Sequence, residues 1–181
     1  MNRAVALLEV SSGHVEVLYA QALFLLRSGY DVSIIIANVN VSRIEAFNLP
    51  ITIYGIKAKK RAAKFRYIHR VIKQNAISTL IINTAHGSII KFLPFRLFGV
   101  KVVGIIHGLE KVRSSITQKL LSLKIRHYFV LSRHLYEQCP TTWLLRCSYF
   151  YPIHFPTFTP LHIDKKEHFY IAIPGQLEFK R

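Results

Sequence analysis

The chain has 181 residues, 51% of them hydrophobic, and carries 25 Lys and Arg against 9 Asp and Glu, a formal net charge of +16. This length suffices for one domain with its own core, and the hydrophobic fraction excludes a disordered chain. The charge predicts an anionic partner, which can be nucleic acid, an acidic membrane surface or a phosphorylated substrate. We expect no signal peptide, because Glu9 interrupts the first apolar run, and no run approaches the ~20 residues that cross a bilayer.

The first predicted unit is a strand over Ala4–Val10, a turn at residues 11–13 and a helix that begins at Val15. Apolar residues recur at helical spacing, at Val15, Leu18, Ala22 and Leu25. Gly29 ends the helix, and Val32–Ala37 is a second strand. A right-handed βαβ unit is therefore expected, with backbone N–H groups beside Gly13 where a ligand can approach closely.

Helices and strands continue to alternate along the chain. Further helices are predicted over Val41–Phe47, Lys57–Gln74, Ser88–Phe98, Ser114–Lys124 and Arg133–Gln138. Further strands are predicted over Ile51–Gly55, Ile77–Asn83, Val100–Ile106 and Tyr128–Leu131. This alternation predicts an α/β fold with a Rossmann-like parallel sheet and helices on both faces.

The common strand order 3-2-1-4-5-6 would bring the ends of the first, fourth and fifth strands together, where ligands bind in such sheets. Small or polar residues follow these strands and the sixth: Ser12, Gly13, His14, Asn83, His86, His107, Gly108 and Ser132. We therefore expect a ligand site at this edge.

The composition and periodicity of the sequence change at Tyr151. Residues 152–167 contain three prolines without any helical or alternating period and are interpreted as a linker. Phe169–Ile173, followed by Pro174 and Gly175, is interpreted as the first strand and turn of a second βαβ unit. The predicted organisation is a Rossmann-like domain over 1–151, a linker over 152–167 and the start of a second domain over 168–181.

Several short motifs occur in a characteristic order. A small-Gly-x-x-Glu pattern follows the first strand from Ser12 to Glu16, GVKVVGIIH ends at His107, and YFVLSRHL includes Ser132. IPGQLEFKR near the end has Gly175, Leu177 and Lys180 in a Gly-Arg-Leu-x-x-x-Lys pattern, with Gln176 in place of Arg. In this order and spacing the chain resembles the N-terminal half of GT-B glycosyltransferases, in particular the retaining family 4 type.

The resemblance implies half of an enzyme that transfers a hexosyl group from a nucleotide sugar to a glycan or a lipid-linked acceptor. Acceptor contacts are expected at Ser12, Gly13, His14, Glu16, Asn83, His86, Gly108 and Ser132. Donor phosphate contacts are expected at Gly13 and Lys180. The family's paired donor glutamates are not in the chain, so little transfer is expected from it alone. No cofactor is expected, because the nucleotide sugar is a co-substrate.

His107 is the residue that we expect to be catalytic. It follows a buried strand at the predicted site, where the family carries a His near the transferred sugar. A histidine there can hydrogen-bond hydroxyls or move a proton near neutral pH. The alternative is a core histidine satisfied by the backbone. Ordinary alternatives also stand for Gly13 (a plain turn), His14 (an exposed helix start) and His86 (a loop histidine).

The sequence lacks the motifs of metal sites and of serine hydrolases. The chain has nine His and two Cys but no HExxH, CxxC or paired-carboxylate set, so no metal site is predicted. Ser132 lies outside any GxSxG context, which argues against a hydrolase nucleophile. Cys139 and Cys147 fit a reduced, cytoplasmic protein, with a single disulfide as the alternative.

A one-sided basic segment points to a membrane. No acidic residue lies between Glu45 and Glu110. The residues expected to face an anionic membrane are Lys57, Lys59, Lys60, Arg61, Lys64, Arg66, Arg70 and Lys73. The basic and aromatic stretch Lys91–Lys101 could add an interfacial surface, although part of it belongs in the core. The alternative is a solvated helix face.

Three function classes follow. The first is a glycosyltransferase acceptor half at the inner face of the membrane, which builds a cell-surface glycan on a lipid carrier. The second is a non-catalytic, membrane-docked subunit that binds the acceptor and works with a separate donor-domain chain. The third is a basic nucleic-acid-binding module, which is disfavoured because no recognised motif accompanies the charge.

Overall fold

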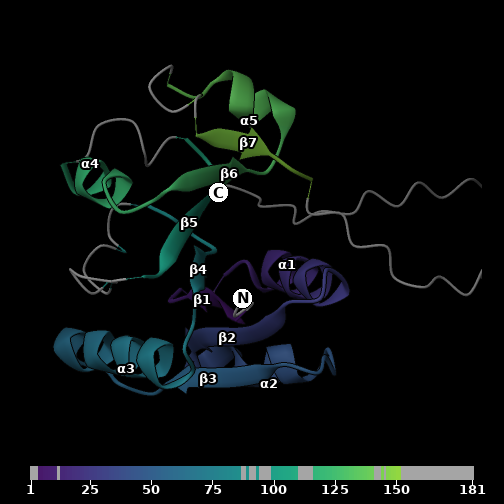
Figure 1. The fold of residues 1–181 in the computed structure, drawn as a ribbon, viewed down its shortest axis with the longest axis vertical. Helices are drawn as coiled ribbons and strands as arrows, with labels where there is room; N and C mark the ends of the chain where they lie inside the picture. Colours follow the sequence, from purple (N-terminus) through teal and green to yellow (C-terminus); the bar gives the residue numbers. More distant parts are fainter. Residues whose placement is uncertain are drawn as a thin grey trace, which may run out of the picture.

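The computed structural model describes residues 4–11, 13–86, 89, 93, 99–109, 116–140, 144 and 146–151. Within them, seven parallel strands form one sheet in the order β3-β2-β1-β4-β5-β6-β7 (Figure 1). The strands are β1 (Ala4–Glu9), β2 (Asp31–Ala37), β3 (Thr52–Ile56), β4 (Thr79–Ile82), β5 (Lys101–Ile106), β6 (His127–Val130) and β7 (Cys147–Tyr149).

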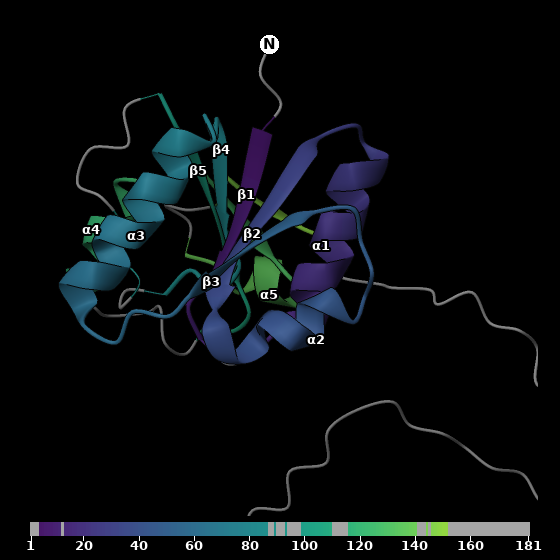
Figure 2. The ribbon, with the colours of Figure 1, turned by 90° about the horizontal axis from the view of Figure 1, so that it is seen from below.

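The helices flank this sheet. They are α1 (Val15–Arg27), the 3₁₀ turn η1 (Asn38–Asn40), α2 (Val41–Glu45), α3 (Arg61–Gln74), α4 (Ile116–Ser122) and α5 (Arg133–Glu137). Figure 2 shows α1 and α2 on one side of the strands and α3 and α4 on the other. The helices therefore form a layer on each face of the sheet.

The core has two parts, one on each face of the sheet. Alternate residues of β1 point to opposite faces, so Leu7 packs with Leu18 of α1 whereas Leu8 packs with Ile68 of α3. Because both faces of the central strands are covered, β1 reads as a continuous apolar run rather than an alternating one.

The predicted fold class and the order of the six predicted strands are confirmed, and each strand end falls within two residues of its prediction. Strand β7, which pairs with β6, was not predicted from the sequence. The start of the basic helix was wrong: α3 begins at Arg61 rather than Lys57, because Lys60 has an extended backbone with φ −72° and ψ 137°. The helix predicted to end at Phe47 stops at Glu45.

Several predictions fall outside the described residues. Most of the helix predicted over Ser88–Phe98 lies there, as do the start of the helix predicted from Ser114 and everything after Tyr151. The predicted linker over 152–167 and the second domain over 168–181 therefore remain predictions.

Gly104 lets the loop after β4 lie tightly against β5. A Cβ atom at Gly104 would come within 2.7 Å of Ile125 Cδ1 and 2.8 Å of Ala85 Cβ. The backbone N–H of Ala85 donates to the carbonyl oxygen of Ile105 at 2.8 Å. These contacts hold the loop after β4 against the end of β5, near the edge where β1 also ends.

Candidate functional site

The site begins with a buried carboxylate at the end of β1. Glu9 is only 1% exposed, and the two carboxylate oxygens of its side chain accept four hydrogen bonds. Oε1 accepts from the backbone N–H and the hydroxyl of Ser11 at 2.8 and 2.7 Å. Oε2 accepts from Asn83 Nδ2 at 2.8 Å and from Thr84 Oγ1 at 2.6 Å. Because a buried carboxylate needs such donors, Glu9 joins the loop after β1 to the loop after β4.

Asn83 connects this carboxylate to α1. Asn83 is 0% exposed, and its Nδ2 reaches the backbone oxygen of His14 at 3.2 Å in addition to Glu9. Its Oδ1 accepts from Gln21 Nε2 at 2.8 Å. The Asn83 side chain therefore lies beneath the site, where it positions other groups rather than touching an acceptor as we expected.

The side chain of His107 forms a hydrogen bond with the backbone of Asn83. Its Nε2 lies 2.6 Å from the carbonyl oxygen of Asn83. A carbonyl can only accept, so Nε2 carries a hydrogen and Nδ1 is the lone-pair acceptor of the neutral ring. Nδ1 has no hydrogen-bond partner among the described residues. The hydrogen bond to the backbone that the alternative interpretation of His107 predicted is therefore present. It leaves Nδ1 available for a ligand.

The ring of His14 lies against the ring of His107, with centroids 3.9 Å apart and an interplanar angle of 35°. His14 caps α1 with φ 61° and ψ 30°, a left-handed conformation that is uncommon for a residue with a Cβ. Burial lowers the pKa of His107 from its usual value, and the nearby His14 lowers it further, whereas the Asn83 carbonyl and Glu9 act in the opposite direction. The ring is thereby kept neutral near pH 7.

Two glycines leave open space at the site. An ideal Cβ on Gly13 or Gly108 would have no heavy atom within 4 Å. The N–H of Gly13 points back to Ser11 Oγ at 3.4 Å, so this amide is only weakly engaged within the turn. The exits of β1 and β5 thus leave room for a ligand beside the two histidines.

The other predicted site residues are more dispersed. Glu16 forms an exposed ion pair with Arg43 at 3.0 Å, directed toward α2. Ser132 caps α5, where its Oγ accepts from the N–H of Leu135 at 3.2 Å. His86 is half-buried in the loop after β4. Ser12 and Lys180 lie outside the described residues.

Sequence reasoning missed Glu9 and Thr84. The available signal was a single acidic residue at the end of an otherwise apolar strand, which the sequence analysis used only to argue against a signal peptide. Across the described residues, no three His, Cys, Asp or Glu side chains group as metal ligands would. Within the same residues no helix has the length and apolar character that a membrane span requires.

Comparisons with known proteins find similarity in structure only. No family model matches the sequence, and no curated protein matches it. MurG from Acinetobacter baumannii superposes with a TM-score of 0.61 at 16% identity, over 84% of this chain and 47% of that chain. A glycosyltransferase from Rickettsia africae ESF-5 gives a TM-score of 0.55 at 14% identity, over 83% of this chain and 43% of that one.

A UDP-GlcNAc 2-epimerase from Methanocaldococcus jannaschii also superposes, with a TM-score of 0.51 at 12% identity, over 74% of this chain and 41% of that chain. The chain therefore spans about half the length of these proteins. The fold is one half of the GT-B architecture, and at this identity the likeness defines the fold alone.

Replacing the buried carboxylate tests the network. Glu9→Gln should lower the free energy of unfolding by about 1–3 kcal/mol, because the new NH₂ group would face donors. Urea unfolding measures this change. Glu16→Gln is the matched control, since an exposed ion pair contributes less than about 1 kcal/mol. Equal losses in the two variants would contradict the role given to Glu9.

The histidine pair predicts a pH effect. In the folded chain His107 should titrate below about 6.5, and His14→Ala should move its pKa upward. Because the unfolded chain then binds the proton more readily, His107 should reduce stability as the pH falls below about 6.5 toward its own lowered pKa. NMR titration of the imidazole Hε1 signals measures both values. A His107 pKa at or above 6.5 would refute this assignment.

Proposed function

We propose that this chain is the acceptor-binding half of a glycosyltransferase that moves a hexosyl group from a nucleotide sugar to a glycan or lipid-linked acceptor. The observation that supports it most directly is that Nδ1 of His107 has no hydrogen-bond partner among the described residues. This ring lies at the edge where β1, β4 and β5 end. The half-GT-B fold and the motif order in the sequence support the same proposal. The narrower assignment to the retaining family 4 type rests on those motifs.

The geometry suits binding of a hydroxyl group. The acceptor hydroxyl donates its hydrogen to Nδ1 of neutral His107, while Nε2 stays fixed on the Asn83 carbonyl. The hydroxyl oxygen then bonds to the anomeric carbon of the donor sugar, and the bond from that carbon to the nucleotide diphosphate breaks. The diphosphate leaves with the electron pair. In this proposal His107 orients the acceptor and holds its proton.

The remaining assignments complete the proposal. Acceptor contacts are proposed at Ser12, Gly13, His14, Glu16, His86, Gly108 and Ser132, and the backbone of Asn83 holds the ring of His107. Gly13 and Lys180 contact the donor phosphates, and a donor-binding half completes the enzyme, either on the same chain or on a separate one. A non-catalytic subunit that binds the acceptor and works with a separate donor-domain chain is the second candidate, since the chain matches about half the length of the similar structures.

The catalytic test is made in the complete enzyme. His107→Asn should lower kcat by about 100-fold or more, because the hydroxyl loses its basic partner. His134→Asn, a change at an exposed histidine on α5, should leave kcat unchanged. Radiolabelled transfer to acceptor gives the rate, and circular dichroism verifies folding. Unchanged turnover in the His107 variant would reject the catalytic role and favour the non-catalytic subunit.

We further propose that the protein is cytoplasmic and binds the inner face of the membrane through its basic segment. Of the eight predicted residues, all except Lys64 are exposed, and Lys64 is half-buried. Ile68, Val71 and Ile72 of α3 point into the core, as does Leu93. The interaction is therefore electrostatic at α3, with the apolar residues of this helix kept inside the domain.

Charge reversal tests this surface. Lys59, Arg66 and Arg70 changed together to Glu should weaken binding to vesicles of 30% anionic lipid by at least about 100-fold, at about 1 kcal/mol for each residue. Arg27, Lys119 and Arg126 changed to Glu alter the net charge equally at exposed positions elsewhere and serve as the control. Sedimentation with vesicles measures the partition. Tighter binding to duplex DNA at matched salt would favour the nucleic-acid alternative.

A further inference from the structure

Two buried thiols meet where α5 lies against β7. Cys139 is the second residue after α5 ends, and Cys147 is the first residue of β7. The two residues are 7% and 6% exposed, and their Sγ atoms are 3.9 Å apart. Both thiols are free, and they are the only cysteines of the chain. The fold therefore brings together, inside the core, two groups that can form one covalent bond.

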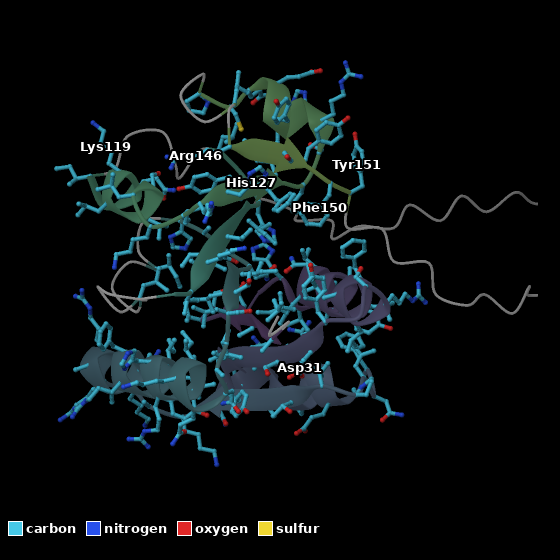
Figure 3. The ribbon with its side chains drawn as sticks, in the orientation of Figure 1. Asp31, Lys119, His127, Arg146, Phe150 and Tyr151 are labelled. Atoms are coloured by element: carbon cyan, nitrogen blue, oxygen red, sulfur yellow. The ribbon has the colours of Figure 1, made fainter. Side chains whose placement is uncertain are left out.

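The strand that carries Cys147 is fixed at its start. Arg146 directly precedes Cys147, and its backbone oxygen accepts from the N–H of Tyr128 on β6 at 2.8 Å. Its side-chain Nη1 donates to the carbonyl oxygen of Ser122, at the end of α4, at 3.1 Å. Figure 3 shows Arg146 at the end of β7 that lies toward α4 and Tyr151 at the opposite end. Cys147 is thus held in place by a neighbouring strand and a neighbouring helix.

Cys139 is fixed by the last turn of α5. Its N–H donates to the carbonyl oxygen of Tyr136 at 3.0 Å, and its Sγ donates to the carbonyl oxygen of Leu135 at 3.4 Å. The ring of Tyr136 also lies near that of Tyr149 on β7, with centroids 5.7 Å apart. Because α5 and β7 are packed together in this way, the two sulfurs stay neighbours, and a reaction between them is effectively unimolecular.

The surroundings keep both groups as thiols near pH 7. Burial raises the pKa of Cys147 to about 12, and the neighbouring Cys139 adds to this effect. Burial also raises the pKa of Cys139, whereas a hydrogen bond with Cys147 lowers it. Cys139 is therefore the more acidic of the two, and its thiolate is the better placed to attack an oxidant.

We propose that a hydroperoxide converts Cys139 and Cys147 into a reversible disulfide, which ties the end of α5 to β7. Helix α5 begins at the end of β6, where Ser132 caps it, so the bond fastens a helix that borders the ligand-binding edge. The inference is independent of the proposed function, because it concerns only the bond between these two side chains.

The reaction has two steps. The Cys139 thiolate attacks one oxygen of hydrogen peroxide and becomes a sulfenic acid, while the O–O bond breaks and the second oxygen takes up a proton and leaves as water. The Cys147 sulfur then attacks the sulfenic sulfur, the S–O bond breaks, and a second water leaves. Two thiols and one peroxide thus give one disulfide and two water molecules. A dithiol reductant reverses the reaction by exchange and is itself oxidised.

Hydrogen peroxide suits this site because the sulfurs are buried. Exchange with a disulfide-bearing molecule would require that molecule to align with a sulfur of a residue less than a tenth exposed, whereas peroxide has only two heavy atoms. The raised pKa of Cys139 makes the first step slow. The pair should therefore respond to sustained rather than brief exposure to peroxide.

Peptide mapping of the reduced 181-residue chain tests the bond. Trypsin cuts after Arg133, Arg146 and Lys165, so the two cysteines fall in separate peptides. After several hours in peroxide, the two peptides should be joined, with a mass two hydrogen atoms below their sum, and dithiothreitol should separate them. Thiols that remain free, oxidation to sulfonic acid without a cross-link, or a cross-link between two chains would overturn the inference.

The bond should also raise the thermal stability of the chain. Closing the loop from residue 139 to residue 147 restricts the unfolded chain, and the midpoint of unfolding should rise by about 5–10 °C. Calorimetry after peroxide treatment measures this shift. Cys139→Ser and Cys147→Ser are the matched controls, with Ala in place of Ser if a buried hydroxyl prevents folding. An equal rise in these variants, or no rise in the cross-linked chain, would contradict the proposed tie between α5 and β7.

Single variants also test the order of the two steps. Without Cys147 the sulfenic acid on Cys139 has no partner, so dimedone should label Cys147→Ser during peroxide treatment. Cys139→Ser should be labelled at least about fivefold less, because Cys147 is the weaker acid. Stronger labelling of Cys147 than of Cys139 would overturn the assigned order of attack.

Discussion

The arrangement of the site depends on the burial of one carboxylate. Glu9 ends a strand whose other side chains are apolar, and its buried oxygens need hydrogen-bond donors from outside that strand. Ser11 supplies two of them locally, whereas Asn83 and Thr84 come from the loop after β4. Since Asn83 also supports His107 and bonds Gln21, the Glu9 carboxylate links the turn after β1, the loop after β4 and the ring of His107.

The sequence was sufficient for the architecture because buried parallel strands carry long apolar runs, and helices carry apolar residues at their own spacing. Strand β7 was not predicted because its three residues are too few to show the alternation of apolar and polar side chains that marks a strand. The start of α3 was misplaced because Lys and Arg are good helix formers and no Gly or Pro lies between Lys57 and Arg61. Such local errors did not disturb the strand order.

The site was predictable only in part. The location of His107 follows from topology, since strand ends meet at one edge. The role of Glu9 does not, because its partners Asn83 and Thr84 are 74 and 75 residues away and no local pattern links them. The stacking of His14 on His107 also depends on a left-handed backbone that is uncommon for histidine. The basic helix α3 and the apolar hollow lined by Phe24, Val103 and Phe150 lie on opposite faces of the sheet.

The buried carboxylate also constrains the order in which the domain assembles. A chain emerging from the ribosome can pair β1 with β2 and β2 with β3 once residue 56 is available. At that stage Glu9 has only its local donors, and water must supply the rest. The end of β1 can close over the carboxylate only after residues 83 and 84 arrive and β4 pairs with β1. The pairing of β1 with β4 is thus the step that gives Glu9 its last donors, and the edge that holds His107 forms once β5 pairs with β4.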